Sequence, residues 1–262
     1  MITLPEPTLR RIEKTLVAVF PNHPVAAVLS TVIQPDAPPS PGQRLYPGSI
    51  TLAASEWAAL AAFSLPKRRA QWYTGRLCAK QAVARYMREH LPQLPLPDSR
   101  GIVIGNLPSG RPYIETRLAG LSGLDLSISH SGDLAAAIVS TAACGIDIQV
   151  DTPSLELVSE RFCRESERQL LLELPGGDYA ACLNMLWTAK EAAKKAARDG
   201  RMPGFLELVI SRPSPAGEGC ILWSARHDDD TLHRLPVTNI LTTRFGQYAF
   251  SIALVPGESS HA

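Results

Sequence analysis

The chain has 262 residues, of which 45% are hydrophobic and 19% charged, proportions typical of a globular protein rather than a disordered one. Its net charge of +1 excludes a global attraction to nucleic acid or membrane, so an anionic ligand must be met by a local cluster of Lys and Arg. We find no apolar run near the roughly 20 residues of a membrane span and no signal-peptide pattern, and therefore expect a cytoplasmic protein.

The first part of the chain contains one predicted strand over residues 25–33, followed by a proline-rich stretch from Pro35 to Pro47 that indicates an extended surface connection. A helix capped by Ser55 is predicted to begin at Glu56, and a second one over about residues 66–90, where apolar side chains recur at approximately helical spacing. This second helix carries the densest positive charge of the sequence: Lys67, Arg68, Arg69, Arg76 and Lys80.

Short runs typical of strands alternate with helical segments in the rest of the chain. The first strands are predicted at residues 102–104, 112–115, 124–129, 134–140 and 144–150. Helices follow over 155–174, in two pieces, and over 178–198, and the last strands are predicted at 206–211, 220–225, 238–243 and 248–255. This order predicts an α+β fold of two similar halves, residues 1–138 and 139–262.

The five cysteines are odd in number and scattered, without the spacing of a zinc site or a disulfide framework. We therefore expect reduced thiols that are mostly buried. They are Cys78, Cys144, Cys163, Cys182 and Cys220.

An acidic residue lies inside the apolar strand predicted at residues 144–150. Because side chains alternate along a strand, Asp147 and Gln149 share one face and Ile146 and Ile148 the other. Taken alone, this pattern is also that of a half-exposed strand with one wet face.

A second acidic residue lies among lysines in the helix predicted over residues 178–198. Trp187, Glu191 and Lys194 share one helical face, with Lys190 at its edge. Taken alone, this segment is also typical of a solvated helix in which a Glu191–Lys195 pair contributes about 0.3–0.5 kcal/mol.

The two segments together could hold one divalent cation and the phosphates of a substrate. Mg²⁺ is usually held by one or two carboxylates together with substrate phosphates and water. Asp147 and Glu191 could supply the carboxylates and Gln149 a neutral carbonyl oxygen, while the neighbouring lysines would neutralise phosphate charge.

In this order and spacing, the two segments resemble the signature of 4′-phosphopantetheinyl transferases of the larger, two-halved type. The family pattern is close to G-[IV]-D-[ILV]-[EQ] followed by W-[ST]-x-K-E-[AS]-x-x-K, and Gln149 stands where that family often has Glu. Four further segments are similar to family motifs, and the resemblance covers about residues 55–255. They are Gly75–Lys80, Gly110–Pro112, Leu126–Gly132 and Arg161–Glu167.

The resemblance implies two α+β halves related by pseudo-twofold symmetry, with coenzyme A in the cleft between them. The implied reaction transfers the 4′-phosphopantetheine arm of coenzyme A to a serine of an apo acyl or peptidyl carrier protein, and releases 3′,5′-ADP. Mg²⁺ would be held by Asp147, Gln149 and Glu191. Glu191 would also be the general base, and Lys194 would help the leaving group.

The resemblance also implies a set of residues that bind coenzyme A. His130 would donate to the 3′-phosphate together with Ser129 and Arg111, and Arg suits phosphate because its planar fork donates two hydrogen bonds. Taken alone, His130 could equally be a structural histidine that caps a turn. The remaining residues of the set are Arg69, Arg76, Lys190 and Lys194.

The predicted partners are the carrier protein and coenzyme A, with no nucleic acid and no membrane, and we expect a monomer that serves natural product biosynthesis. Two alternatives stay open at this point. One is a catalytically silent relative that binds a carrier protein or coenzyme A. The other is a structural or interaction protein whose similarities arose by chance.

Overall fold

The computed structural model describes residues 6–35, 50–115, 120–174, 178–197, 202–217, 219–228 and 238–255. Its described residues form two compact units: unit 1 comprises residues 24–141, and unit 2 comprises residues 142–255 together with 6–23. Helices and antiparallel sheets occur in both, which confirms the predicted α+β class. The predicted boundary at 138/139 and the twofold relation between the halves stay predictions.

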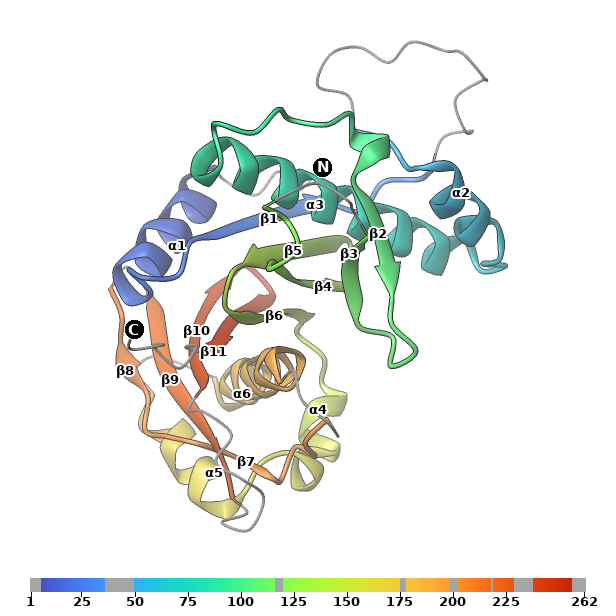
Figure 1. The fold of residues 1–262 in the computed structure, drawn as a ribbon. Coiled ribbons are helices and arrows are strands. Elements are labelled where there is room, and N and C mark those ends of the chain that lie inside the picture. Colours follow the sequence, from blue (N-terminus) through green and yellow to red (C-terminus); the bar gives the residue numbers. More distant parts are fainter. Residues whose placement is uncertain are drawn as a thin grey trace. The chain divides into compact units, whose positions relative to one another are not determined.

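Unit 1 is built around a three-stranded antiparallel sheet of order β1-β5-β4 (Figure 1). Its strands are β1 (Val25–Thr31), β4 (Asp125–Ser131) and β5 (Leu134–Ser140). The long helix α3 (Pro66–His90) packs on all three strands and begins with a proline at its first turn, where the missing N–H costs nothing. Small buried residues of α3, such as Ala79 and Ala82, allow this close packing.

The other elements of unit 1 lie beside α3. They are α2 (Ala54–Ala61), the 3₁₀ turn η1 (Ser99–Gly101) and a hairpin of β2 (Val103–Asn106) and β3 (Pro112–Glu115). Of these, α2 and β2 contact α3. The hairpin approaches the sheet because β3 lies against β4.

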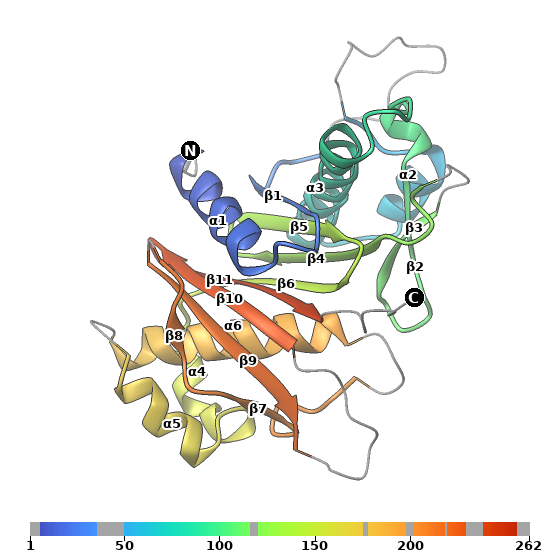
Figure 2. The same ribbon diagram turned by 60° about the vertical axis from the view of Figure 1, so that its left-hand side comes forward.

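Unit 2 contains a larger antiparallel sheet of order β6-β11-β10-β9-β7, with β8 paired to β9. Its long helix α6 (Tyr179–Ala196) lies along one face of that sheet (Figure 2). The strands are β6 (Ala143–Val150), β7 (Leu208–Ile210), β8 (Ser214–Pro215), β9 (Cys220–His227), β10 (Thr238–Phe245) and β11 (Tyr248–Val255).

Shorter helices complete unit 2. The elements α4 (Ser154–Leu157), η2 (Ser159–Arg161) and α5 (Glu165–Leu172) precede α6, and α4 and α5 pack against it. Helix α1 (Glu6–Val19) was not predicted, because the proline-rich composition of the first fifty residues hid its buried Ile12 and Leu16, four residues apart on one face. The strand β8 was also missed.

The two units share one connectivity. In unit 1 the chain passes through β1, α2, α3, β2, β3, β4 and β5, and in unit 2 through β6, α5, α6, β7, β9, β10 and β11 in the same roles. Each unit ends in a hairpin whose turn glycine, Gly132 or Gly246, has a φ of +54°, a backbone conformation that favours glycine. In each unit the last strand pairs antiparallel with the first.

Strand register defines which residues of the sheets are equivalent. Thr31 lies opposite Leu134, the first residue after the turn of unit 1, and Val150 lies opposite Tyr248, the first strand residue after the turn of unit 2. Counting from these positions gives the equivalent pairs Ala26 and Gly145, Val28 and Asp147, Ser30 and Gln149, and His130 and Arg244.

One buried lysine in each long helix aligns α3 with α6. The alignment pairs Lys80 with Lys190, and hence Gly75 with Met185, Gln81 with Glu191, and Arg85 with Lys195. An independent contact supports it, because Arg85 Nη1 donates to the Ala27 carbonyl at 3.4 Å and Lys195 Nζ donates to the Ile146 carbonyl at 3.1 Å. Ala27 and Ile146 are themselves equivalent in the strand register, so the two units repeat one framework.

Candidate active site

Gly145 brings helix α6 unusually close to strand β6 in unit 2. A Cβ at this position would lie 1.9 Å from the Ala192 carbonyl oxygen and 2.7 Å from the Ala196 nitrogen. Only glycine permits this approach of two backbones. Since Gly145, Asp147 and Gln149 alternate onto one strand face, the close approach directs the Asp147 side chain toward α6.

Asp147 meets a lysine of α6 on that face. Its Oδ1 accepts a hydrogen bond from Lys195 Nζ at 2.6 Å, and the same ammonium donates to the Ile146 carbonyl. Asp147 is almost fully buried, with 6% of its surface exposed, so the ion pair neutralises a carboxylate that burial would otherwise disfavour. Glu191 precedes Lys195 by one helical turn, so it projects on the side of α6 that Asp147 contacts.

Glu191 lies beside an aromatic cluster. Lys194 Nζ is 3.6 Å from Glu191 Oε1 and 3.7 Å from the centre of the Phe205 ring, a favourable cation–π contact. Trp187 stacks on Phe205 with ring centroids 4.5 Å apart. Trp187 therefore packs α6 against its aromatic neighbours, and Lys194 is held against the same cluster.

The oxygen donors on this face fit a hard cation such as Mg²⁺. Asp147 and Glu191 offer carboxylates, and Gln149, whose Nε2 donates to the Val150 carbonyl at 3.3 Å, offers a neutral amide. Within the part of the chain that the structure describes, three or more His, Cys, Asp and Glu side chains nowhere gather as an all-protein metal site. A cation here would therefore need substrate phosphates or water to complete its coordination.

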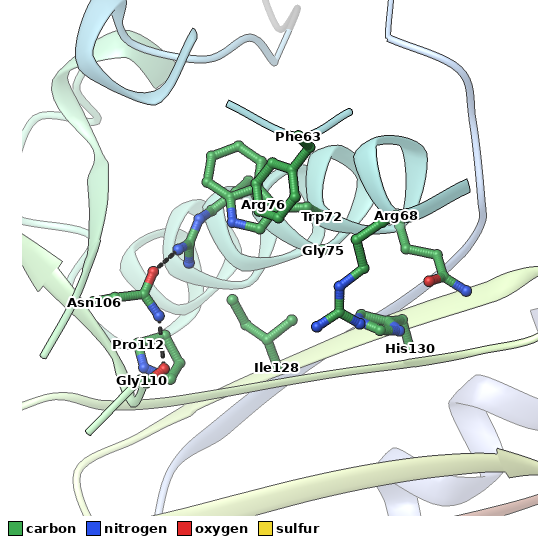
Figure 3. A pocket seen from close by; sticks show the side chains of 11 residues that line it. Phe63, Arg68, Trp72, Gly75, Arg76, Asn106, Gly110, Pro112, Ile128 and His130 are labelled. Carbon is green, nitrogen blue, oxygen red and sulfur yellow. Dashed lines mark hydrogen bonds between the residues drawn. The ribbon is translucent and has the colours of Figure 1, made fainter. Parts of the chain in front are cut away.

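Unit 1 contains a cationic pocket between α3 and β4, with a cavity volume of about 230 Å³. Figure 3 shows Arg68 and His130 at one end, the Phe63 and Trp72 rings along one wall, and Arg76 at the other end. Positive or titratable nitrogen groups at both ends suit an anion. The other lining residues are Gln71, Gly75, Asn106, Gly110, Pro112 and Ile128.

Arg76 is fixed within this pocket by contacts on two sides. Its Nη2 donates to the amide oxygen of Asn106, and its guanidinium lies 4.7 Å from the Trp72 ring centre. Its Nε is buried, and none of the described residues accepts a hydrogen bond from it. Burial lowers the pKa of Arg76, an effect that the negative charge of Glu56 opposes. A buried cation with an unused donor is a suitable partner for phosphate.

The structure does not bring every predicted coenzyme A residue to the pocket. Arg111 Nη2 donates to Asp125 Oδ2 at 2.6 Å, and Ser129 lies on the strand face opposite Ile128 and His130. Arg69 is half-buried and does not line the pocket. Their predicted contacts with the substrate stay predictions that this geometry does not favour.

Lys190 lies in the interior of unit 2 rather than beside the substrate face. Its Nζ has no exposed surface and donates to Glu167 Oε2 at 2.6 Å and to the Phe162 and Phe205 carbonyls at 2.7 and 3.1 Å. Burial lowers the pKa of Lys190, and the negative charge of Glu167 opposes that shift. An ammonium with three internal acceptors is not available to a phosphate, so this geometry argues against the predicted contact.

Sequence reasoning missed several residues that the structure places at these two sites. Lys195 was passed over for Lys194, although its spacing of four from Glu191 and its place at the end of the family pattern were visible signals. Arg68 could have been found from its helical spacing with Trp72 and Arg76, which puts all three on one face of α3. Asn106 carried no sequence signal.

The comparisons with known proteins agree with one another. A sequence model of the 4′-phosphopantetheinyl transferase superfamily matches residues 143–253. The 4′-phosphopantetheinyl transferase HetI of Nostoc sp. (strain PCC 7120) is 31% identical over 181 residues, which cover 67% of this chain and 72% of that protein. The Synechocystis sp. (strain PCC 6803) protein slr0495, named as a candidate 4′-phosphopantetheinyl transferase, is 29% identical over 63% of this chain and 65% of its own length.

The chain therefore belongs to the 4′-phosphopantetheinyl transferase superfamily. This confirms the predicted family and the prediction of an enzyme that transfers phosphopantetheine to carrier proteins, a reaction for which the superfamily uses coenzyme A and a divalent metal. Of the two alternatives, the chance similarity is excluded.

Within the described residues, no helix combines the length and apolar character that crossing a membrane requires.

Proposed function

We propose that this enzyme catalyses Mg²⁺-dependent transfer of 4′-phosphopantetheine from coenzyme A to a serine of an apo acyl or peptidyl carrier protein. The observation that carries the proposal is the face shared by β6 and α6, where Gly145 permits the close approach of the helix and Lys195 bonds Asp147, with Glu191 one helical turn before Lys195. In the reaction the serine oxygen forms a bond to the phosphorus that bears the pantetheine arm. The bond from that phosphorus to the bridging oxygen breaks, and 3′,5′-ADP leaves.

The residues of unit 2 supply the chemistry of the reacting group. Asp147 and Glu191 would hold the cation with Gln149, and bound Mg²⁺ would stabilise the charge that develops on the bridging oxygen. Glu191 would accept the serine proton, directly or through water. Lys195 replaces Lys194 as the proposed partner of the leaving group, because its ammonium already lies at Asp147.

The pocket of unit 1 supports binding of a phosphate group of coenzyme A. Its volume of about 230 Å³ is below the roughly 300–1,000 Å³ typical of complete ligand sites, so it suits one end of the substrate. Arg68 and His130 would bind the 3′-phosphate, and the stacked Trp72 with Arg76 would border the rest of the nucleotide. Arg69, Arg111 and Ser129 remain proposed contributors.

The test is a mass-spectrometric assay with coenzyme A, a panel of apo carrier proteins and a titration of Mg²⁺. We expect one carrier to gain the mass of a single phosphopantetheine arm, with 3′,5′-ADP as the second product and no gain in the presence of a chelator. A carrier variant with the acceptor serine changed to alanine is the control. Metal-independent turnover would contradict the assignment of Asp147 and Glu191, and coenzyme A binding without any turnover would favour the catalytically silent alternative.

A further inference from the structure

Among the described residues, each unit contains a buried ion pair that the proposed chemistry does not use. In unit 1, Lys80 Nζ lies 2.6 Å from Glu56 Oε2, and the two side chains are 0% and 3% exposed. Lys80 also donates to the Ser99 and Ile102 carbonyls at 2.8 and 2.5 Å. We call Glu56–Lys80 the first buried pair.

Glu56 connects three elements of unit 1. Its Oε2 accepts from the Ala53 backbone N–H at 2.7 Å, at the start of α2, and its Oε1 accepts from the Ile104 N–H of β2 at 3.0 Å. Since Lys80 belongs to α3, the first buried pair fixes α2, α3 and β2 to one another.

The second buried pair, Glu167–Lys190 in unit 2, has the same construction. Glu167 Oε2 accepts from the Arg164 N–H at 2.9 Å, at the start of α5, and its Oε1 accepts from the Ile210 N–H of β7 at 2.9 Å. Lys190 of α6 donates to Glu167 and to two backbone carbonyls, as Lys80 does. The second buried pair therefore fixes α5, α6 and β7.

Burying a charged pair is costly unless every donor and acceptor is used, and replacing such a pair by apolar residues is often neutral or stabilising. Stability alone is therefore a weak reason for two such pairs in equivalent positions. Each pair is, however, directly connected to one of the two sites described above.

The second buried pair lies beside the carboxylates of unit 2. Lys190 immediately precedes Glu191, so fixing its ammonium by three acceptors sets the rotation of α6 about its axis and with it the direction of Glu191. The same lysine binds the Phe205 carbonyl, and the Phe205 ring contacts Lys194 and Trp187.

The first buried pair lies beside the pocket of unit 1. Lys80 is one helical turn after Arg76, and Glu56 holds Ile104, which is two residues before Asn106 on β2. Asn106 in turn accepts the hydrogen bond of Arg76. Both ends of the Arg76–Asn106 contact therefore depend on the first buried pair.

We propose that the two buried pairs are positioning groups with separate duties: Glu167–Lys190 orients the metal-binding Glu191, and Glu56–Lys80 orients Arg76 and Asn106 in the coenzyme A pocket. This inference rests on the proposed function. It predicts that equivalent substitutions in the two units damage different steps of one reaction.

The experiment compares Glu167→Gln with Glu56→Gln in the full chain. Each change keeps side-chain size and removes one charge from an equivalent position. For Glu167→Gln we expect the Mg²⁺ concentration at half-maximal rate to rise and kcat to fall by about tenfold or more, because supporting groups of metal ligands contribute effects of this size. Its dissociation constant for coenzyme A, measured by calorimetry in the presence of a chelator, should stay within about twofold of wild type.

For Glu56→Gln we expect the opposite pattern. Coenzyme A should bind about tenfold more weakly in the same calorimetry, as expected when a charge-assisted contact loses its geometry. At saturating coenzyme A, the half-maximal Mg²⁺ concentration should stay within about twofold of wild type. Unfolding by urea, followed by circular dichroism, shows whether both variants are folded under assay conditions.

The inference would be overturned if each variant lost apparent Mg²⁺ affinity and coenzyme A affinity to the same extent, or if neither variant lost either. Both outcomes leave the proposed function intact. If Glu167→Gln or Glu56→Gln does not fold, it is replaced by the uncharged double variant of the same pair, Glu167→Leu/Lys190→Met or Glu56→Leu/Lys80→Met. A folded double variant with wild-type constants would equally overturn the inference. Failure of the wild-type protein to bind coenzyme A in calorimetry with Mg²⁺ present would instead contradict the proposed function itself.

Discussion

Units 1 and 2 are built on one framework but carry different side chains at the positions where chemistry is expected. The strand position of Asp147 holds Val28 in unit 1, and the helix position of Glu191 holds Gln81. Val28 packs into the core of unit 1, whereas Asp147 pairs with Lys195. The framework thus provides an equivalent strand position and an equivalent helix position in both units, and unit 2 carries acidic side chains at both.

At the cationic pocket, unit 1 carries the residues that line the cavity, and the equivalent residues of unit 2 do not. Gly75 lines the pocket of unit 1, where a Cβ would come within 3.0 Å of an Ile128 side-chain carbon, whereas the equivalent Met185 is buried in the core of unit 2. His130 lines the pocket, whereas its equivalent Arg244 is engaged by Asp151 through two hydrogen bonds of 2.7 and 3.0 Å. The pocket of unit 1 therefore corresponds in unit 2 to positions that are filled by packing or by an ion pair.

The strongest test of this comparison removes the carboxylates of unit 2. We expect Asp147→Ala and Glu191→Ala each to lower kcat by about a thousandfold or more, because losing a metal ligand costs several kcal/mol of transition-state stabilisation. The equivalent variants Val28→Ala and Gln81→Ala are the controls and should retain turnover at saturating Mg²⁺. Near-normal rates in either acidic variant, measured with folded protein, would remove the basis for the metal site.

The second test concerns the close approach at Gly145. Gly145→Ala should lower the free energy of unfolding by about 1–3 kcal/mol or more, because its Cβ meets backbone atoms that cannot move aside as a side chain could. Gly123→Ala is a matched control, since a Cβ there has no atom within 4 Å and its backbone does not require glycine. Urea denaturation measures both, and equal stability of the two variants would show that α6 does not depend on Gly145.

Much of the framework could be predicted from the sequence. The helix predicted over about residues 66–90 runs from Pro66 to His90 in the structure, because Pro66 marks its start and apolar side chains recur at approximately helical spacing. The order of elements predicted two similar halves, but their residue-by-residue equivalence could not be predicted, because it resides in strand register and in two buried ion pairs whose partners are more than twenty residues apart. A buried lysine such as Lys190 looks the same in a sequence as a lysine that meets phosphate.

The pocket shows the same limit on a smaller scale. His130 and Arg76 were predicted from motif resemblance, and both line the pocket. Arg111 was predicted on equal grounds but is bonded to Asp125, fourteen residues away. Which of two neighbouring polar residues faces a cavity depends on the strand face and on such long-range partners, and neither is visible in local sequence.

The third prediction separates the pocket from its counterpart in unit 2. His130→Ala should weaken binding of coenzyme A about tenfold, because a charge-assisted hydrogen bond is worth about 1.5–3 kcal/mol, and should affect dephospho-coenzyme A much less. Arg244→Ala, at the equivalent position, should leave both affinities near wild type. Calorimetry with the two ligands is the measurement, and equal losses for both would place the 3′-phosphate away from His130.

The smallest expected effect is that of Gln149→Glu, which sharpens the comparison within the metal site. Gln149 and its equivalent Ser30 occupy the same place in the framework, and each donates a hydrogen bond to the carbonyl of the next residue, Val150 or Thr31. Gln149 also shares a strand face with Asp147, so a carboxylate there would point toward the cation. Since cation affinity follows ligand charge, we expect the half-maximal Mg²⁺ concentration to fall roughly fivefold, about 1 kcal/mol, with kcat retained.

Ser30→Glu is the matched control for this prediction, because it adds the same charge at the equivalent position of unit 1. There the counterparts of Asp147 and Glu191 are Val28 and Gln81, which carry no negative charge. It should leave the Mg²⁺ dependence unchanged. The metal titration is run at fixed, saturating coenzyme A and carrier protein, so that only cation binding varies. An unchanged or higher half-maximal Mg²⁺ concentration for Gln149→Glu would mean that residue 149 does not face the metal. A neutral residue would then be tolerated there because the cation takes its ligands from Asp147, Glu191, substrate and water alone.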